Sequence, residues 1–234
     1  MRKELLWDLL YPARCAFCDK VLPWGRDLVC KECEKKITYV KEPGCCKCGK
    51  PVKEEEEFCF DCSRREHEYT RGAALFEYTF IKSSLYRFKY QGREAYARVY
   101  GRYMAHHFKN QREAWKPQAL IPVPIHKKRR RKRGYNQAEL IARELGKYWK
   151  IPVVTDLVIR TKNTRPMKEL DGQQRQNNLK KAFLLGRNDV KLSTVVIIDD
   201  IYTTGNTVDA VARVCKEAGI TQVYFLTVSI GQGL

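Results

Sequence analysis

The sequence predicts an α/β protein in which a parallel sheet flanked by helices follows a small cysteine-rich module. Two observations lead to this fold class. Nine of the ten cysteines fall between positions 15 and 62, in a region that contains four C-x-x-C pairs. After position 62, short apolar segments alternate with amphipathic helical ones, which is typical of a parallel sheet covered on both faces. The 234 residues suffice for one such domain and a small module.

The composition bounds the class of protein and of partner. Hydrophobic residues make up 44% of the chain, so a buried core is expected and global disorder is excluded. The formal net charge is +18 and the sequence pI is near 9.5, which favours polyanionic partners such as nucleic acid, phosphates or acidic lipid heads. Charge alone does not choose among these three.

The sequence predicts no transmembrane segment and no signal peptide. No stretch reaches the roughly 18 apolar residues that a membrane helix needs. The opening segment, residues 1–12, contains Glu4 and Asp8 and lacks the apolar core of a signal peptide. Its leucines share one helical face, so we expect a short helix that docks on the body, with a membrane-surface anchor as the alternative. We therefore expect a cytoplasmic protein.

The four C-x-x-C pairs predict two metal sites. Two intervening residues let a tight turn direct both thiolates at one ion, and a second pair completes a tetrahedral shell. In a reducing compartment, clustered cysteines bind metal more often than they form disulfides. Zinc suits four thiolates, with iron as the alternative; pairing in sequence order is expected, although crossed pairing stays open. The predicted ligands are Cys15, Cys18, Cys30, Cys33, Cys45, Cys48, Cys59 and Cys62.

These two ribbons are too small to fold without metal, so metal binding and folding are expected to be coupled there. They either brace the neighbouring domain or contact nucleic acid, and the acidic run 54–57 argues against a general DNA-binding face on the second ribbon. Cys46 is expected to be a bystander, and Cys215 a core residue of an apolar helix. We expect residues 1–66 to form the N-terminal helix and double zinc ribbon, and residues 67–234 the second domain.

The second domain is predicted to alternate between strands and helices. Asn136 is a possible helix N-cap, and Gly219 is the expected C-cap of the last helix. The predicted strands are 72–80, 119–125, one or two short strands within 152–159, 182–185, 194–198 and 222–230, and the predicted helices are 83–91, 94–109, 136–149 and 203–219.

The segment VVIIDDIYTTGNT, residues 195–207, describes a site for a ribose 5-phosphate. Ligands of parallel sheets bind beyond the carboxyl ends of the strands, and a helix that begins near position 204 offers unpaired N–H groups to a phosphate. Asp199 and Asp200 can accept hydrogen bonds from sugar hydroxyls. The nucleoside triphosphate and dinucleotide glycine motifs are absent. The expected ligand-binding residues are Asp199, Asp200, Thr203, Thr204, Gly205, Asn206 and Thr207.

The same segment resembles the thirteen-residue phosphoribosyl pyrophosphate (PRPP) motif of type I phosphoribosyltransferases. The resemblance implies that the acidic pair holds the ribose 2- and 3-hydroxyls, that loop 203–207 binds the 5-phosphate, and that magnesium accompanies PRPP. Residues 121–146 and 160–183 are similar to the ComF/GntX family, amidophosphoribosyltransferase-like proteins linked to bacterial DNA uptake, and the double zinc ribbon completes that architecture. One departure is Met167, which stands where the family usually has Gln in the T-x-x-Q pattern that begins here at Thr164.

The basic run HKKRRRKR, residues 126–133, follows a predicted strand at the same sheet edge. Transfer of ribose from PRPP expels pyrophosphate, whose charge requires magnesium and cations. Arg133 is the main catalytic candidate for contact with pyrophosphate, and Arg129 is the next. Arg175 is a further catalytic candidate, because a mobile loop can bring it to the site on closure. The alternative for most of the run is a solvated face.

The same run also suits single-stranded nucleic acid, where cations follow the backbone and aromatic rings stack on bases. Tyr135 is a candidate stacking platform. Tyr86, Phe88 and Tyr90 show period-two spacing beside Arg87 and Lys89, although core packing is the expected use of at least one of them.

Two functions follow from these observations. The first is a magnesium-dependent phosphoribosyltransferase of nucleoside metabolism, or a relative that retains PRPP binding, whose acceptor is recognised by a hood at about residues 70–115. The second is a DNA-uptake factor that uses the transferase fold to bind single-stranded DNA or proteins of the uptake machinery. Both can hold if PRPP or a nucleotide acts as a regulator.

Overall fold

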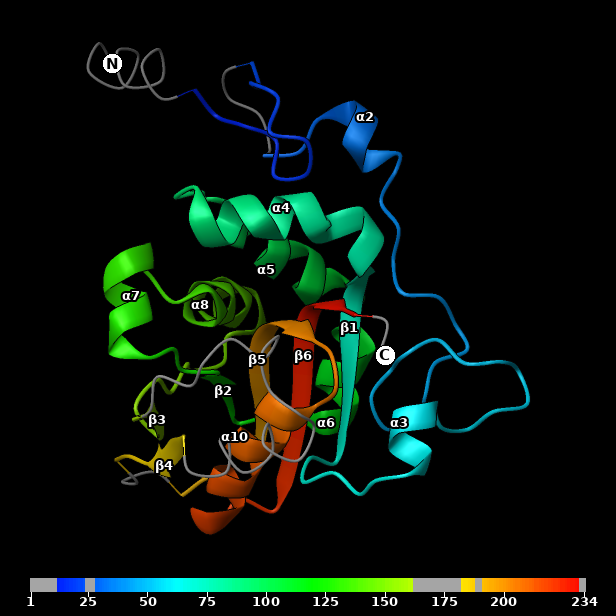
Figure 1. Cartoon of the computed structure of the whole chain (residues 1–234), viewed down its shortest axis with the longest axis vertical. Helices are drawn as coiled ribbons and strands as arrows, with labels where there is room; N and C mark the ends of the chain where they lie inside the picture. Colours follow the sequence, from blue (N-terminus) through cyan, green and yellow to red (C-terminus); the bar gives the residue numbers. More distant parts are fainter. Residues whose placement is uncertain (1–11, 24–27, 162–181, 188–190, 232–234) are drawn as a thin grey trace.

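A four-stranded parallel sheet forms the centre of the second domain (Figure 1). The computed structural model describes residues 12–23, 28–161, 182–187 and 191–231. The strand order is β1-β6-β5-β2, and every neighbouring pair is parallel. This confirms the predicted sheet. The strands are β1 (Arg71–Glu77), β2 (Ala119–Pro122), β5 (Thr194–Tyr202) and β6 (Gln222–Ile230).

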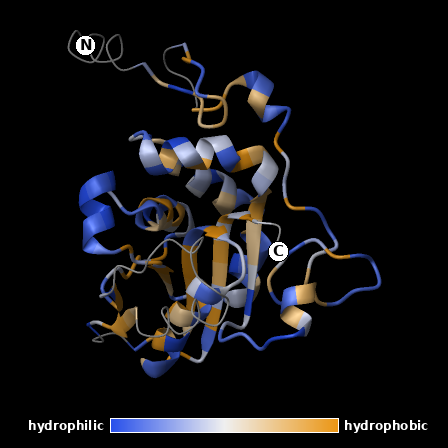
Figure 2. Cartoon of the chain, viewed as in Figure 1, coloured by the Kyte–Doolittle hydropathy of each residue, from blue (hydrophilic) through white to orange (hydrophobic). Residues whose placement is uncertain are grey.

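Alternate residues of the strands pack on opposite faces of the sheet. Val196 and Ile198 join the core that contains α4, α5 and α8, whereas Val195 and Ile197 join the core that contains α10, β3 and β4. Figure 2 shows the hydrophobic strands at the centre and the hydrophilic α7 at the edge. The remaining elements are α2 (Lys31–Glu34), α3 (Phe60–Ser63), α4 (Tyr78–Tyr90), α5 (Tyr96–His107), α6 (Lys109–Trp115), α7 (Lys127–Arg133), α8 (Gln137–Trp149), β3 (Val158–Arg160), β4 (Phe183–Leu185) and α10 (Asn206–Glu217).

Several predicted boundaries differ from the structure; the strand predicted over 119–125 ends at Pro122, and the helix predicted over 203–219 begins at Asn206. The strand predicted over 72–80 ends at Glu77, and α4 begins at once, because Ile81, Leu85 and Phe88 are buried at helical spacing. The strand predicted to end at position 198 continues to Tyr202 and pairs with β6 along this extension. The C-cap of α10 is Ala218, with Gly219 following at a φ of +88°.

Other sequence predictions for this domain have mixed outcomes. Cys215 is fully buried in the core, as predicted. In 152–159, Val153 forms one parallel bridge to Leu120, and β3 begins at Val158. Asn136 occupies the N-cap position of α8, but its amide donates to the Val123 carbonyl over 3.0 Å instead of capping the helix.

The described residues include no helix long and apolar enough to cross a membrane. The predicted helix in residues 1–12 falls almost wholly outside the described part of the chain, as do Thr164, Met167 and Arg175. The boundary at 66/67 and the hood at about 70–115 stay predictions. In the structure, the hood range holds β1, α4, α5 and α6.

Candidate functional site

Asp199 and Asp200 lie near the carboxyl end of β5, and each has a different hydrogen-bond partner. Asp200 accepts an ion-pair hydrogen bond from Lys89 of α4, with Nζ to Oδ1 at 2.9 Å. Asp199 accepts from the backbone N–H of Asp200 at 2.8 Å. Burial, and then repulsion by Asp200, raise the pKa of Asp199 to about 7, although Lys89 and Arg160 oppose the rise. The folded protein therefore disfavours the ionised form of Asp199, which lies at the carboxyl edge of the sheet.

Loop 203–207 joins β5 to the first turn of α10, and it can take only glycine at position 205. Gly205 is the N-cap of α10 and has a φ of +79°, a conformation that side chains with a Cβ rarely adopt. A Cβ there would also lie 2.8 Å from the Tyr202 hydroxyl and 3.0 Å from Cε1 of His67. The loop thus presents the amino end of a twelve-residue helix, which suits a phosphate.

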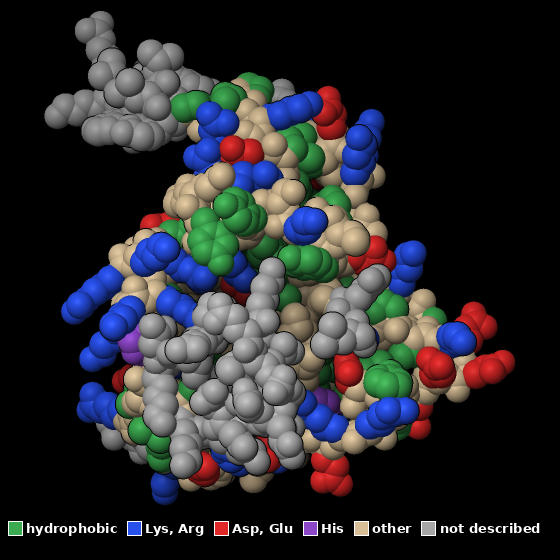
Figure 3. All heavy atoms as spheres, viewed as in Figure 1, with side chains coloured by type: hydrophobic (Ala, Val, Ile, Leu, Met, Phe, Trp, Pro, Cys, Tyr) green, Lys and Arg blue, Asp and Glu red, His purple; other side chains and the backbone are tan. Residues whose placement is uncertain are grey.

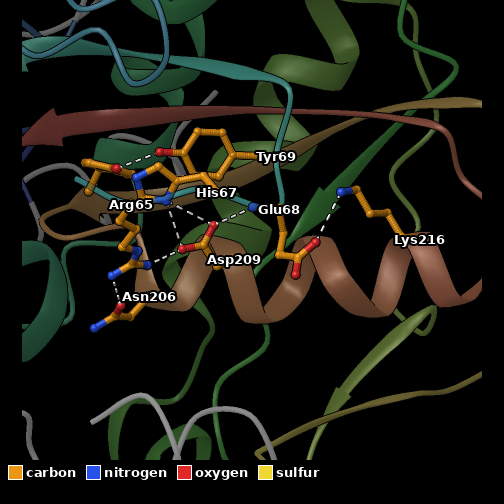
Figure 4. A network of polar contacts seen from close by, with 8 residues as sticks. Arg65, His67, Glu68, Tyr69, Asn206, Asp209 and Lys216 are labelled. Carbon is orange, nitrogen blue, oxygen red and sulfur yellow. Dashed lines mark hydrogen bonds and ion pairs between the residues drawn. The ribbon is translucent and has the colours of Figure 1, made fainter. Parts of the chain in front are cut away.

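A polar network joins the segment before β1 to the first turn of α10, as Figure 4 shows. Arg65 donates to Oδ1 of Asn206 at 2.6 Å and pairs with the carboxylate of Asp209. Nδ1 of His67 lies 3.0 and 3.2 Å from the two oxygens of Asp209. The backbone N–H of Glu68 donates to Asp209 at 3.0 Å. One carboxylate in the first turn of α10 therefore binds three groups of the segment that follows the second ribbon.

This network also adjusts the charge at the amino end of α10. An unpaired Asp209 would repel a phosphate at that helix end, but Arg65 pairs with it and compensates its charge. Burial is the largest influence on His67 and lowers its pKa, yet Asp209 and Cys62 together raise it above its ordinary value. The amino end of α10 therefore keeps its attraction for anions.

Sequence reasoning missed Arg65 and His67. Their only local signal is the basic and polar stretch between the last ribbon cysteine and the first strand. Their partners lie 141 to 144 residues further along the chain.

The predicted basic run is a helix, α7, with two kinds of cation. Arg129 and Arg133 lie one turn apart and are partly buried, whereas the other cations of the helix are exposed. Arg133 donates to Oε1 of Gln137 at 3.0 Å, and its guanidinium lies 5.0 Å from the ring centroid of Tyr90. Arg133 is thus held in place.

A third cation, Arg160 of β3, interacts electrostatically with Arg129 of α7 and with Asp199. Burial and repulsion by Arg133 lower the pKa of Arg129. Burial and repulsion by Arg129 lower the pKa of Arg160 to about 10, while Asp199 opposes this shift. Crowded cations beside a carboxylate are the arrangement that an anionic ligand stabilises. Arg160 was not predicted from the sequence.

The predicted stacking platform at Tyr135 is wrong. Its ring is only 6% exposed and its hydroxyl donates to the carbonyl of Phe88, because α8 begins just beyond it and packs against the sheet. Phe88 is buried, as expected for at least one of the three aromatics of α4. Tyr86 and Tyr90 are each 58% exposed, with ring centroids 5.1 Å apart.

The eight predicted cysteine ligands form two clusters in sequence order. In each cluster, the four sulfurs lie within 4.8 Å of one another. The Cys18–Cys30 and Cys48–Cys59 sulfur distances are 3.7 and 3.6 Å, close to the about 3.8 Å edge of a tetrahedron with zinc–sulfur bonds of about 2.3 Å. The donor set and spacing fit structural zinc, and Cys46 lies outside both clusters.

The two ribbons use the same turn and pack on opposite faces of the sheet. Asp19 and Gly49, each directly after a C-x-x-C pair, have positive φ angles of 62° and 74°. Cys15 belongs to the core of α4, α5 and α8, whereas Cys48 and Cys59 belong to the core of α10. A hydrogen bond from Cys48, with smaller contributions from His67 and Cys59, lowers the pKa of Cys62 to about 4 against the opposing effect of burial.

The second domain has a parallel sheet with two carboxylates, loop 203–207 and the cationic helix α7 at one edge. This arrangement defines a phosphoribosyltransferase-type domain, and a double zinc ribbon precedes it. Residues 6–63 match the double zinc ribbon domain and residues 94–229 the phosphoribosyl transferase domain. The chain belongs to the ComF/GntX family of proteins with this arrangement.

Relatives from Haemophilus influenzae, Escherichia coli and Bacillus subtilis align with most of this chain. Competence protein F of Haemophilus influenzae is 30% identical over 90% of this chain and 93% of its own. DNA utilization protein YhgH of Escherichia coli (strain K12) is 27% identical over 92% and 96%. Competence protein ComFC of Bacillus subtilis is 27% identical over 82% and 79%. Among solved structures, a purine phosphoribosyltransferase from Pyrococcus horikoshii is 15% identical over 58% of this chain and 84% of its own, with a TM-score of 0.37.

Proposed function

We propose that this protein binds PRPP with magnesium at the carboxyl edge of its sheet and acts as a phosphoribosyltransferase-type protein. The observation that carries the proposal is the junction of β5 and α10, where Asp199 and Asp200 lead directly into loop 203–207. The carboxylates can accept hydrogen bonds from the ribose hydroxyls, and the amino end of α10 can bind the 5-phosphate. Lys89 would then release or share Asp200 when the sugar binds.

The cations of α7 suit the pyrophosphate group. Strand β2 is the neighbour of β5, and the N–H of Val123 donates to Ile198 at 2.9 Å, so the segment that leads into α7 begins beside the end of β5. Arg129 and Arg133 are the two partly buried cations of α7. They can neutralise charge on the leaving group as the bond from ribose C1 to oxygen breaks and its electron pair passes to pyrophosphate. Magnesium bound with PRPP supplies further neutralisation.

A cavity on the other side of β5 suits the acceptor. It has a volume of about 810 Å³ and is lined by the ends of the strands, at Thr203, Ile230 and Tyr78, and by Lys50 and Phe60 of the second ribbon. An incoming acceptor attacks ribose C1 from the face opposite the leaving group. The strand order places this cavity toward β6 and β1 and the cations toward β2, so β5 lies between them. The identity of the acceptor is open, and the ribbon, together with the hood, would take part in its recognition.

Calorimetric titration with PRPP and magnesium tests the proposal. The double variant Asp199→Asn with Asp200→Asn should lower affinity at least about 100-fold, because each lost charge-assisted hydrogen bond costs about 1.5–3 kcal/mol. Lys127→Gln, which changes an exposed cation of α7, is the matched control and should leave PRPP affinity nearly unchanged. Wild-type protein that fails to bind PRPP at millimolar concentration would overturn the proposal.

A second candidate function, binding of single-stranded DNA, is supported by the surface of α7 and α4. The exposed cations of α7 share their helix with Arg133, which contacts the exposed ring of Tyr90, and Tyr86 packs beside Tyr90. In Figure 3, basic side chains gather along the edge of the molecule over α7, next to hydrophobic side chains over α4. Cations and stacking rings together suit single strands. The names of the relatives, competence and DNA utilization proteins, agree with this role or with docking to proteins of the uptake machinery.

Crossed substitutions separate the two ligands. Changing four exposed cations of α7 to Gln (Lys127, Lys128, Arg130 and Arg131) should flatten the salt dependence of single-strand binding by about three units of slope, at about 0.7 per contact. PRPP affinity should change little. Arg133→Gln should do the reverse. Equal losses of both ligands in both variants would contradict the division.

The reduced thiols that zinc requires agree with a cytoplasmic location.

A further inference from the structure

The segment between the second cysteine cluster and β1 contacts loop 203–207 and the first turn of α10. Within seven residues of Cys62, this linker (residues 65–69) makes polar contacts with Asn206, Asp209 and Tyr202. We propose that zinc in the second cluster positions loop 203–207 and the first turn of α10, acting through His67 and Asp209. The consequence for PRPP rests on the function proposed above, whereas the effect on the loop itself does not.

His67 is a bridge between the cluster and the helix. Its side chain has no exposed surface. Nδ1 faces Asp209, while Nε2, on the opposite side of the ring, is buried and has no hydrogen-bond partner among the described residues. The Cys62 thiol, a ligand of the second cluster, lies five residues before His67 and raises the pKa of the same ring. A histidine between a metal ligand and a carboxylate restrains the position of both.

Asp209 passes this constraint to the loop. It lies in the first turn of α10, and its backbone N–H donates to Gly205 at 2.8 Å. His67 also packs directly on Gly205, where an added Cβ would lie 3.0 Å from Cε1. The hydroxyl of Tyr69 lies 2.7 Å from that of Tyr202, the last residue of β5. The linker thus contacts both ends of the loop.

Zinc bound at the second cluster fixes the conformation of the chain where this linker begins. Helix α3 has four residues, its N-cap Cys59 makes no side-chain capping bond, and none of its residues is buried. A segment of this size has too little buried surface to hold its own conformation, so zinc binding supplies the order. Loss of zinc should therefore release Cys62 and His67, and then Asp209.

The first cluster offers a matched control within the same chain. Its ribbon contacts α4: Ser84 donates to the carbonyl of Ala16, and Arg87 donates to the carbonyl of Phe17 at 2.5 Å. The two clusters pack on opposite faces of the sheet. Zinc in the first cluster should therefore order α4 and have no effect on the first turn of α10.

Hydrogen exchange on the zinc-loaded full-length protein tests the proposal, with zinc content measured in parallel. Cys62→Ser and His67→Ala should each raise exchange of the amides of residues 206–210 at least about 10-fold, because local opening becomes easier. His67→Ala should keep two zinc ions. The double variant should exchange no faster than either single variant, since both changes break one pathway. Cys33→Ser should spare residues 206–210 and raise exchange in α4.

Two results would overturn the proposal. One is unchanged exchange at residues 206–210 in Cys62→Ser after loss of one zinc ion. The other is additive effects of the two substitutions, which would mean that His67 acts without the metal. If Cys62→Ser does not fold, stepwise chelation of zinc from wild type and from His67→Ala gives the same comparison. PRPP titration of the same samples is read separately: a zinc effect on exchange without PRPP binding in wild type would overturn the proposed function and leave this inference intact.

Discussion

Asp199→Asn should make the protein more stable at pH 8 and hardly more stable at pH 4. The folded state raises the pKa of Asp199 from 3.8 to about 7, so the unfolded state loses this proton first and stability falls as pH rises from about 4 to about 7. A shift of about three units corresponds to about 4 kcal/mol at most. Because the side chain is not sealed from solvent, we expect about half, or about 2 kcal/mol. An amide keeps the hydrogen bond from the Asp200 N–H.

Thermal unfolding measured between pH 4 and pH 8 provides the assay. A gain of about 2 kcal/mol raises Tm by about 4–8 °C for a chain of this size. Asp200→Asn is the matched control, since it removes the partner of Lys89 and should lower Tm at pH 8. The reasoning is refuted if Asp199→Asn lowers Tm at pH 8, or raises it equally at both pH values. On the function proposed above, the same substitution should weaken PRPP binding, and a stabilising change that lowers activity is typical of a site selected for function.

Three further predictions concern the metal, the loop and the lysine. Purified protein should contain two zinc ions per chain by elemental analysis, and iron, or no metal in a folded reduced sample, would contradict the zinc assignment. Gly205→Ala should destabilise the fold by about 1–3 kcal/mol in denaturant unfolding, because its φ of +79° and the nearby Tyr202 hydroxyl resist a Cβ; unchanged stability would contradict the strain argument. Lys89→Met should lower stability more at pH 8 than at pH 4, since Lys89 opposes the rise in the pKa of Asp199 and its loss makes that carboxylate costlier to ionise; a loss independent of pH would contradict it.

The sequence predicted the parts of the site that lie close together along the chain. The carboxylates and loop 203–207 lie within thirteen consecutive positions, residues 195–207, and each zinc ligand lies three residues from another, so spacing alone identifies them. The pairing of the clusters in sequence order followed the same local logic and was confirmed, whereas the strand order was not predicted.

The remaining site residues depend on tertiary contacts that no local pattern encodes. Arg65 and Asn206 are separated by 141 residues, and Lys89 and Asp200 by 111. Tyr135 follows a glycine and a basic run, which resembles an exposed loop, yet the start of α8 buries its ring against Phe88. The polar residues that follow the last ribbon cysteine have the composition of an ordinary linker until the fold brings α10 against them.

In the function proposed above, the two ribbons contact different walls of one ligand site. The first ribbon contacts α4 through Ser84 and Arg87, and α4 presents Lys89 to Asp200. The second ribbon contacts α10 through the linker and His67, and α10 with its preceding loop provides the phosphate-type cradle. Each zinc ion therefore braces one wall of the same edge, so partial zinc loss should weaken sugar or phosphate contacts selectively instead of unfolding the sheet.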